Sequence, residues 1–296
     1  MIILTGSTGF LGSALLQKLL EREDEVIAIK RSTSSTARLS HCLGNPRLRM
    51  LDIDLEDPLK CFEECRIDTI IHTATEYGRG MTPLRNIINA NILLPLQLAE
   101  LGAKYGAGCF INTDSFFNKA GHSYSNLLNY SLSKKSLLIW LDKLADDLKI
   151  INVVLEHVYG PRDSPSKFVE SIIRRVGIDQ IPHVALTHGH QRRDFIFVDD
   201  VVQAYLKLID FSRSEEFRLE HIEVGTGTAI QVRDFVDQVK LISGSTTSLG
   251  YGEIPYRDDE IMSSQADIKR ISNLGWKSTF SPHDGINRIL STYQSK

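Results

Sequence analysis

A glycine-rich turn near the N-terminus constrains the fold more than any other feature of this sequence. The segment Thr5 to Gly12 follows a short apolar run, Ile2 to Leu4, and precedes leucines at helical spacing. A strand, a turn with glycines at these positions and a helix together form the phosphate-binding unit of dinucleotide-binding folds. The helix N-terminus offers N–H groups and a positive dipole end to phosphates. The alternative, a glycine-rich turn without a ligand, does not explain why all three parts occur together. We expect cofactor contacts from Gly6, Thr8, Gly9, Phe10, Leu11 and Gly12.

Apolar runs alternate with helical patterns along the first half of the chain. The predicted strands are residues 2–4, 26–29, 48–53, 69–71, 110–111 and 151–155, and the predicted helices include 61–65, 84–105 and 130–148. This alternation predicts an α/β fold with a doubly wound parallel Rossmann sheet. After Gly160-Pro161 the elements become shorter, with predicted strands at 195–198 and 222–224. We expect an NADP-binding Rossmann domain over residues 1–164, with returns near 195–226. A smaller α/β substrate lobe is expected over residues 165–296.

Composition excludes several classes of partner. The chain has 296 residues and a net charge of −3, without a basic patch or tail, so we expect neither nucleic acid nor a membrane surface as a partner. No apolar run approaches the ~18 residues of a membrane span. The first strand starts at Ile2, which leaves no room for a signal peptide. We therefore expect a cytoplasmic protein. No metal is expected, because neither the cysteines nor the histidines at 183, 188 and 190 follow a zinc spacing.

The end of the second predicted strand indicates which dinucleotide binds. NAD-binding sites place an acidic residue about 20 residues beyond the turn, on the ribose 2′-hydroxyl. Here the sequence is Lys30-Arg31-Ser32, with two cations and no acid. Cations suit the 2′-phosphate of NADP(H), and Arg31 is the better candidate for a bidentate grip. The competing interpretations are a solvated basic loop and an NAD site.

Tyr130 and Lys134 are the predicted catalytic pair. They lie four residues apart and so share one face of a helix. A free phenol has a pKa of about 10, and a neighbouring ammonium is expected to lower it. The pair then serves as general acid and base at a carbonyl–alcohol centre. A Tyr-x-x-x-Lys spacing is common by chance, but this one follows the fifth strand, where the carboxyl ends of the strands converge.

A hydroxyl donor is expected beside the reacting oxygen. The fifth strand ends in Asn112-Thr113-Asp114-Ser115, at the sheet edge where ligands bind. Thr113 is the first candidate and Ser115 the second, for both catalysis and substrate binding. The alternative for either hydroxyl is that it only stabilises the turn.

These features and several further motifs resemble one family. The motifs are Asp54-Leu55, Ile71-His72-x-Ala74, Val158-Tyr159-Gly160-Pro161 and Arg193-Asp194-Phe195-x-x-Val198-Asp199-Asp200. With the glycine turn and the Tyr130–Lys134 pair, they make the chain similar to the extended short-chain dehydrogenase/reductases that act on nucleotide sugars. The resemblance covers nearly the whole chain.

The resemblance implies roles for individual residues. Asp54 and Leu55 would contact the adenine, and Ala74 and Thr75 would line the cofactor. His157 and Val158 would flank the nicotinamide. The remaining implied residues would contact the sugar nucleotide, with the two arginines on its diphosphate: Glu76, Tyr77, Lys167, Phe168, Arg193 and Arg257.

The segments around Thr75-Glu76-Tyr77, Asp114-Ser115-Phe116 and Glu156-His157 narrow the resemblance further. They are similar to family members that use NADPH to reduce the 4-keto group of CDP-linked 3,6-dideoxyhexos-4-uloses for O-antigen synthesis. Dehydratases of the family carry Asp-Glu after the threonine, whereas this chain has Asp114-Ser115, which argues against 4,6-dehydration. His157, Phe117 and Val154 also depart from the wider family's usual Asn, Tyr and Arg.

The resemblance further implies a homodimer through the predicted helices 84–105 and 130–148. Two other functions stay open: a nucleotide-sugar 4-epimerase with tightly bound NAD, and a dinucleotide sensor without catalysis. The intact Tyr130–Lys134 pair weighs against the sensor, which has no need of an acid and base.

Overall fold

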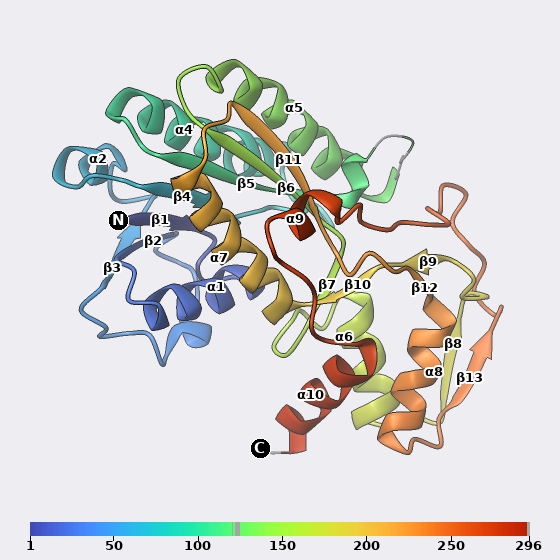
Figure 1. The fold of residues 1–296 in the computed structure, drawn as a ribbon. Helices are drawn as coiled ribbons and strands as arrows, with labels where there is room; N and C mark the ends of the chain where they lie inside the picture. The colour runs from blue at the N-terminus through green and yellow to red at the C-terminus, as the bar shows by residue number, and fades with distance from the viewer. Residues whose placement is uncertain (120, 122–124, 295–296) are drawn as a thin grey trace. The chain divides into compact units, whose positions relative to one another are not determined.

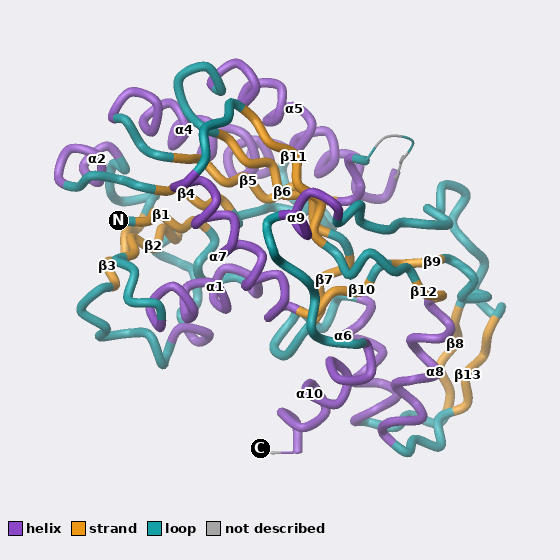
Figure 2. The backbone as a smooth tube through the Cα atoms, viewed as in Figure 1, coloured by secondary structure: helices purple, strands orange, loops and turns teal. Residues whose placement is uncertain are grey.

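The computed structural model describes residues 1–119, 121 and 125–294. The chain divides into two compact units (Figures 1 and 2). The first unit comprises Met1–Val154 and Val202–Ile222, and the second comprises Leu155–Val201 and Glu223–Lys296. Each unit is described by itself below.

A seven-stranded sheet in the order β11-β6-β5-β4-β1-β2-β3 forms the centre of the first unit. Neighbouring strands from β3 through β5 pair in parallel, as the alternation of strands and helices predicted. This confirms the doubly wound α/β fold. The strands are β1 (Ile2–Thr5), β2 (Val26–Lys30), β3 (Leu48–Asp52), β4 (Thr69–His72), β5 (Cys109–Ser115), β6 (Ile150–Leu155) and β11 (Leu219–Val224).

Helices cover both faces of this sheet. Figure 1 shows α4 and α5 on one face and α1 and α7 on the other. The helices are α1 (Phe10–Glu21), α2 (Leu59–Glu64), α3 (Leu84–Ile88), α4 (Leu94–Tyr105), α5 (Leu128–Leu144) and α7 (Val198–Ser214). Short 3₁₀ segments are η1 (Ala37–Leu39), η3 (Phe116–Asn118) and η4 (Ser125–Leu127), and η2 (Asn89–Leu93) is a π-helix between α3 and α4.

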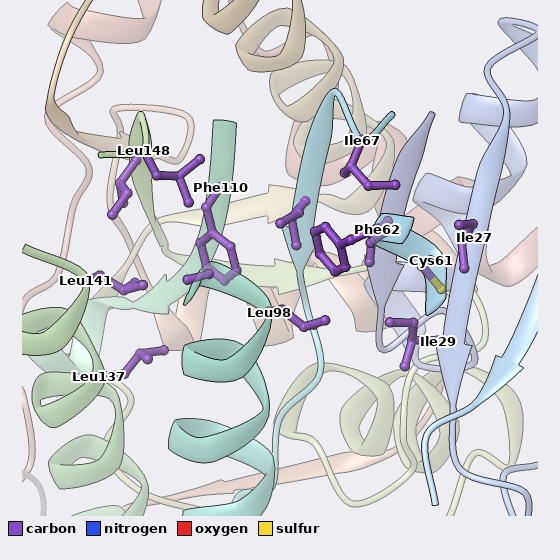
Figure 3. Close-up of a cluster of buried hydrophobic side chains, with 14 of the residues drawn as sticks. Ile27, Ile29, Cys61, Phe62, Ile67, Leu98, Phe110, Leu137, Leu141 and Leu148 are labelled. Carbon is purple, nitrogen blue, oxygen red and sulfur yellow. The ribbon is translucent and has the colours of Figure 1, made fainter. Parts of the chain in front are cut away.

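The hydrophobic core between the sheet and the helices α4 and α5 holds α5 in place beside β5. Phe110 of β5 packs with Leu98 of α4 and with Leu137 and Leu141 of α5, all fully buried (Figure 3). Burying one such side chain stabilises the fold by about 2 kcal/mol. Because α5 is held through these contacts, the residues near its N-terminus stay at a fixed place beside the end of β5.

The second unit is built from short strand pairs and helices. Strand β7 (His157–Tyr159) pairs in parallel with β10 (Phe195–Phe197), and β8 (His183–Leu186) with β13 (Ser248–Tyr251). The antiparallel pair is β9 (Arg192–Arg193) and β12 (Ile230–Gln231). The helices are α6 (Phe168–Ile172), the π segment η5 (Ile173–Ile178), α8 (Val232–Ser243), α9 (Lys269–Asn273) and α10 (Pro282–Gln294). Among the described residues of the whole chain, no helix is long and apolar enough to cross a membrane.

Candidate active site

The glycine turn packs so closely against segment 73–74 and the start of α1 that side chains do not fit at Gly6 and Gly12. Gly6 has φ +70°, and a Cβ atom there would lie 2.5 Å from the backbone nitrogen of Ala74. A Cβ atom on Gly12 would overlap the Gly6 carbonyl oxygen. The Gly9 N–H donates a 2.8 Å bond to that same oxygen, and Gly9 is the N-cap of α1. The turn therefore fits a dinucleotide pyrophosphate against the backbone at a helix N-terminus.

The carboxyl ends of β2 and β3 bring together the residues expected around the adenosine. Lys30 forms an ion pair with Asp52, so its charge is already compensated. Asp54 accepts bonds of 2.7 Å and 2.5 Å from the backbone N–H and hydroxyl of Ser32, and these bonds lower the pKa of Asp54. Arg31 is exposed and has no ion pair within the described part of the chain. Of the two predicted cations, Arg31 is thus the one available for a phosphate.

Segment 73–76 is held between the glycine turn and a buried asparagine. The Thr73 hydroxyl donates a 2.8 Å bond to the Thr5 carbonyl. Asn91 accepts from the Glu76 N–H at 2.7 Å and donates to the Glu76 carbonyl at 2.8 Å. Its amide also donates to the Ser133 hydroxyl at 2.9 Å, on the helix that carries the predicted catalytic pair Tyr130 and Lys134. Sequence reasoning missed Asn91, although π-helical segments such as η2 are frequent at functional sites.

Tyr130 and Lys134 lie on α5 and are almost fully buried, with exposed fractions of 5% and 1%. The Lys134 ammonium donates a 2.8 Å hydrogen bond to the carbonyl oxygen of Thr113 at the end of β5. Burial lowers the pKa of Lys134 to about 8, and the Asp114 carboxylate opposes this shift. The structure therefore places the pair beside β5, as the sequence predicted.

The charge state of Tyr130 differs from the sequence-based expectation. Burial holds its pKa well above the ordinary value, and Tyr77 and the Asp114 carboxylate raise it further. A hydrogen bond with Ser115 acts in the opposite direction but does not outweigh burial. The Lys134 ammonium donates to the Thr113 carbonyl. Without cofactor, Tyr130 is a phenol that retains its proton.

The two candidate hydroxyls at the end of β5 have different partners. The Thr113 hydroxyl is hydrogen-bonded to the hydroxyl of Tyr205, with 2.6 Å between the oxygens. The Ser115 hydroxyl is bonded to Tyr130 and also accepts from the Phe117 N–H at 3.4 Å. Thr113 is the one residue of β5 that is not buried. Ser115 is therefore bonded directly to Tyr130, and Thr113 is linked to the same helix through the bond of its carbonyl with Lys134.

The carboxylate of Asp114 belongs to a buried polar network. It accepts bonds from the Ser115 N–H at 2.8 Å, from Asn118 at 2.6 Å and from Asn152 at 3.0 Å. Asn112 donates to Asn152 at 2.7 Å and completes the network. These bonds occupy both carboxylate oxygens and position the charge that acts on Lys134 and Tyr130.

The Tyr77 ring completes the surroundings of the phenol. Its centroid lies 5.0 Å from that of the Tyr130 ring, and the Arg79 guanidinium lies 5.3 Å above Tyr77. Tyr77 is thus beside Tyr130, as expected for a residue near the sugar ring. Glu76 adjoins it and accepts from the Gly78 N–H at 3.1 Å.

The candidates for substrate binding in the second unit are in part already paired. Arg193 on β9 forms a 2.6 Å ion pair with Glu260, whose N–H donates to the Arg257 carbonyl. Lys167 forms a 3.0 Å ion pair with the buried Asp163. His157 on β7 is partly exposed, and loss of solvent around its ring, together with the nearby Arg193 and Lys167, holds its pKa well below the ordinary value. The structure thus brings the segments of Arg193 and Arg257 together through Glu260, which sequence reasoning missed.

The other two residues of this unit that were predicted to contact ligands are Val158 on β7 and Phe168 at the start of α6. Phe168 is 41% exposed, which leaves its ring accessible to a ligand.

A dinucleotide-binding sheet with a buried tyrosine–lysine pair beside its fifth strand defines a class of nicotinamide-dependent enzymes. Residues 2–225 match the NAD dependent epimerase/dehydratase family, and the chain belongs to this family. This confirms the resemblance found in the sequence.

Individual relatives narrow the comparison. The chain is 35% identical to a CDP-abequose synthase of Salmonella muenchen and 38% identical to that of Salmonella typhimurium. Each match covers 98% of this chain and 97% of the relative.

Solved structures share the fold over the whole chain. A UDP-glucose 4-epimerase from Thermotoga maritima, with UDP-glucose, superposes with a TM-score of 0.83 at 24% identity, covering 99% of this chain and 98% of the other. MoeE5 in complex with UDP-glucuronic acid and NAD gives a TM-score of 0.82 at 22% identity, covering 100% and 99%.

Proposed function

We propose that this protein is an NADPH-dependent reductase of a CDP-linked 3,6-dideoxyhexos-4-ulose, which yields CDP-abequose or its C4 epimer, CDP-paratose. The observation that carries the proposal is the constellation of Thr113, Tyr130 and Lys134 at the end of β5. The near-full-length similarity to two CDP-abequose synthases supports the choice of substrate.

The protonation state of Tyr130 suits reduction. Reduction of a ketone needs a proton for the oxygen that becomes an alkoxide. Burial keeps the pKa of Tyr130 high, so the phenol carries that proton at neutral pH. We assign proton donation to Tyr130, with Ser115 bonded to it, and contact with the reacting oxygen to Thr113. Lys134 holds the Thr113 carbonyl and supplies positive charge beside the site.

The nicotinamide cofactor supplies the hydride when it is bound. The glycine turn would hold its pyrophosphate, because Gly6 and Gly12 allow the tight turn that ends at the N-terminus of α1. Asp54, Leu55, Ala74 and Thr75 would line the adenosine side.

The preference for NADPH over NADH rests on Arg31. It is exposed at the end of β2, and its guanidinium matches a phosphate with two parallel donors. Lys30 contributes less than the sequence suggested, because it pairs with Asp52.

The second unit is proposed to bind the nucleotide sugar. Arg193 and Arg257 would hold the diphosphate of the sugar nucleotide. Lys167 and Phe168 would contact the sugar nucleotide, and His157 and Val158 would flank the nicotinamide. Arg193 already forms an ion pair with Glu260, so this role requires its guanidinium to reach the diphosphate as well. Glu76 and Tyr77 are proposed to contact the sugar, and the Tyr77 ring lies beside that of Tyr130.

We also propose a homodimer formed through α3, α4 and α5. The apolar side chains that these helices leave exposed are Leu84, Ile88, Leu93, Leu128, Leu132, Ile139 and Trp140. Exposed apolar side chains gathered on neighbouring helices are typical of an interface between subunits. Trp140→Glu is expected to give monomers in analytical ultracentrifugation at concentrations where the wild type is dimeric. A wild-type monomer would contradict the assembly.

The test of the function is consumption of NADPH with CDP-4-keto-3,6-dideoxyglucose, followed by NMR of the product. Tyr130→Phe is expected to abolish turnover while NADPH still binds, because the ring remains and only the proton donor is lost. A 4-epimerase would instead retain NAD through desalting and show no net oxidation of NADPH. Undiminished biological activity of Tyr130→Phe would favour a sensor.

A further inference from the structure

Tyr205 is a buried phenol that the proposed reaction does not yet use. It lies on α7, in the part of that helix that belongs to the first unit, and its side chain is 0% exposed. Figure 1 shows α7 on the face of the sheet opposite to α4 and α5. Its hydroxyl is bonded to that of Thr113 at 2.6 Å, across 92 positions of sequence.

A phenol in this place requires an explanation. Phenylalanine would fill the same apolar space, whereas a buried hydroxyl without a partner costs free energy. Burial also raises the pKa of Tyr205 well above its ordinary value, so the hydroxyl keeps its proton at any physiological pH. The nearby Asp114 carboxylate acts in the same direction, and only the bond with Thr113 opposes it.

The surroundings decide the direction of the hydrogen bond. Within the described part of the chain, Thr113 is the hydrogen-bond partner that the Tyr205 hydroxyl has. If Thr113 donated, the phenolic proton would be left without an acceptor inside the protein. If Tyr205 donates, its buried phenolic proton has an acceptor, and the proton of the partly exposed Thr113 hydroxyl is free to be donated elsewhere.

We propose that Tyr205 is a positioning residue, which donates to the Thr113 hydroxyl and thereby directs the Thr113 proton toward the oxygen of the reacting ketone. Thr113 is then fixed from two sides: Lys134 of α5 holds its carbonyl, and Tyr205 of α7 holds its hydroxyl. Accepting one hydrogen bond also strengthens the next one that a hydroxyl donates. The inference rests on the proposed function, because it assigns a partner to Thr113 in that reaction.

The test is Tyr205→Phe, which removes the hydroxyl and keeps the ring. We expect kcat with the CDP-linked 4-keto sugar to fall about tenfold, which corresponds to the loss of one hydrogen bond in the transition state. The KM for NADPH and the NADPH dissociation constant are expected to stay within about twofold of the wild type, because the lost hydroxyl is bonded to Thr113 of β5 and not to the glycine turn.

A matched control is Ser212→Ala on the same helix. Its hydroxyl is bonded to the Cys109 thiol at the opposite end of β5. This variant also removes a hydroxyl contact between α7 and β5, but not one at Thr113. It is expected to keep the wild-type kcat.

A double-mutant cycle separates positioning from a structural effect. Thr113→Val should lower kcat by itself, and adding Tyr205→Phe should cause little further loss, because both act through one hydroxyl. Additive losses in the double variant would overturn the proposal, and so would an unchanged or raised kcat in Tyr205→Phe. In either case, turnover of the keto sugar by the wild type would still support the proposed function. A wild type that does not reduce the keto sugar would contradict both the proposed function and this inference.

Discussion

Lys134 is predicted to lower the stability of the protein at neutral pH while it serves the reaction. Its pKa is about 8 in the folded protein, against an ordinary value of 10.5, because the ammonium is buried. Below pH 8 the folded state carries a charge that burial disfavours. Between pH 8 and 10.5 the unfolded chain binds more protons than the folded chain, so the contribution of Lys134 to stability rises with pH. The difference corresponds to about 3 kcal/mol.

Lys134→Met removes the charge and keeps the length of the side chain. The variant also loses the hydrogen bond to the Thr113 carbonyl, which costs about 1 kcal/mol. We therefore expect Lys134→Met to be inactive and yet more stable than the wild type by about 2 kcal/mol at pH 7. This difference should fall toward zero by pH 10, as the wild-type lysine becomes neutral.

The assay is urea denaturation of both proteins at pH 7 and pH 9.5, compared as a difference so that other titrating groups cancel. Lys143→Met, at an exposed position on the same helix, is the control and should leave stability within about 0.5 kcal/mol. A variant that is less stable than the wild type at both pH values would refute the reasoning that burial dominates the pKa of Lys134.

Three further predictions concern the cofactor and the fold. Gly12→Ala should weaken NADPH binding about thirtyfold, because the added Cβ would overlap the Gly6 carbonyl oxygen at a cost of about 2 kcal/mol. Fluorescence titration measures the NADPH affinity, and an affinity equal to that of the wild type would contradict this prediction. Arg31→Ala should lower kcat/KM for NADPH at least about tenfold and leave that for NADH nearly unchanged; an equal loss with both would argue against a 2′-phosphate contact. Asp200→Ala should lower the free energy of unfolding by about 3 kcal/mol, because its buried carboxylate accepts three hydrogen bonds from Thr279 and Phe280. A denaturant titration measures this, and unchanged stability would show that these bonds do not stabilise the fold.

The sequence predicts the sheet of the first unit well, because its strands are local apolar runs. Ile2–Thr5 and Val26–Lys30 are buried along their whole length or nearly so, and each adjoins a turn or helix signal. In the second unit the predicted strand at 195–198 corresponds to β10, but β8 and β13 were missed, because they mix polar and apolar residues without alternation. The predicted single helix from Leu84 to Tyr105 is helical throughout but contains the π segment η2, which no local pattern marks.

Tyr130 and Lys134 could be selected from the sequence because they are neighbours on one helix, and their catalytic role stays a prediction. The contacts of several other candidate residues could not be predicted, because they join residues that are distant in sequence. Thr113 with Tyr205 is one example, and Arg193 with Glu260 in the second unit is another, at a separation of 67 positions. Such contacts depend on how elements pack, and a single sequence carries no periodic signal for them. The same holds for the pKa of Tyr130, which burial controls more than its neighbour in sequence does.

Transfer of deuterium from NADPH labelled at the nicotinamide C4 tests the proposed reaction most directly. Incubated with CDP-4-keto-3,6-dideoxyglucose, the protein should oxidise one NADPH per sugar and place one deuterium at C4 of the product, which NMR detects. A product without deuterium, or a sugar that changes configuration while NADPH is conserved, would contradict the assignment of a 4-ketoreductase.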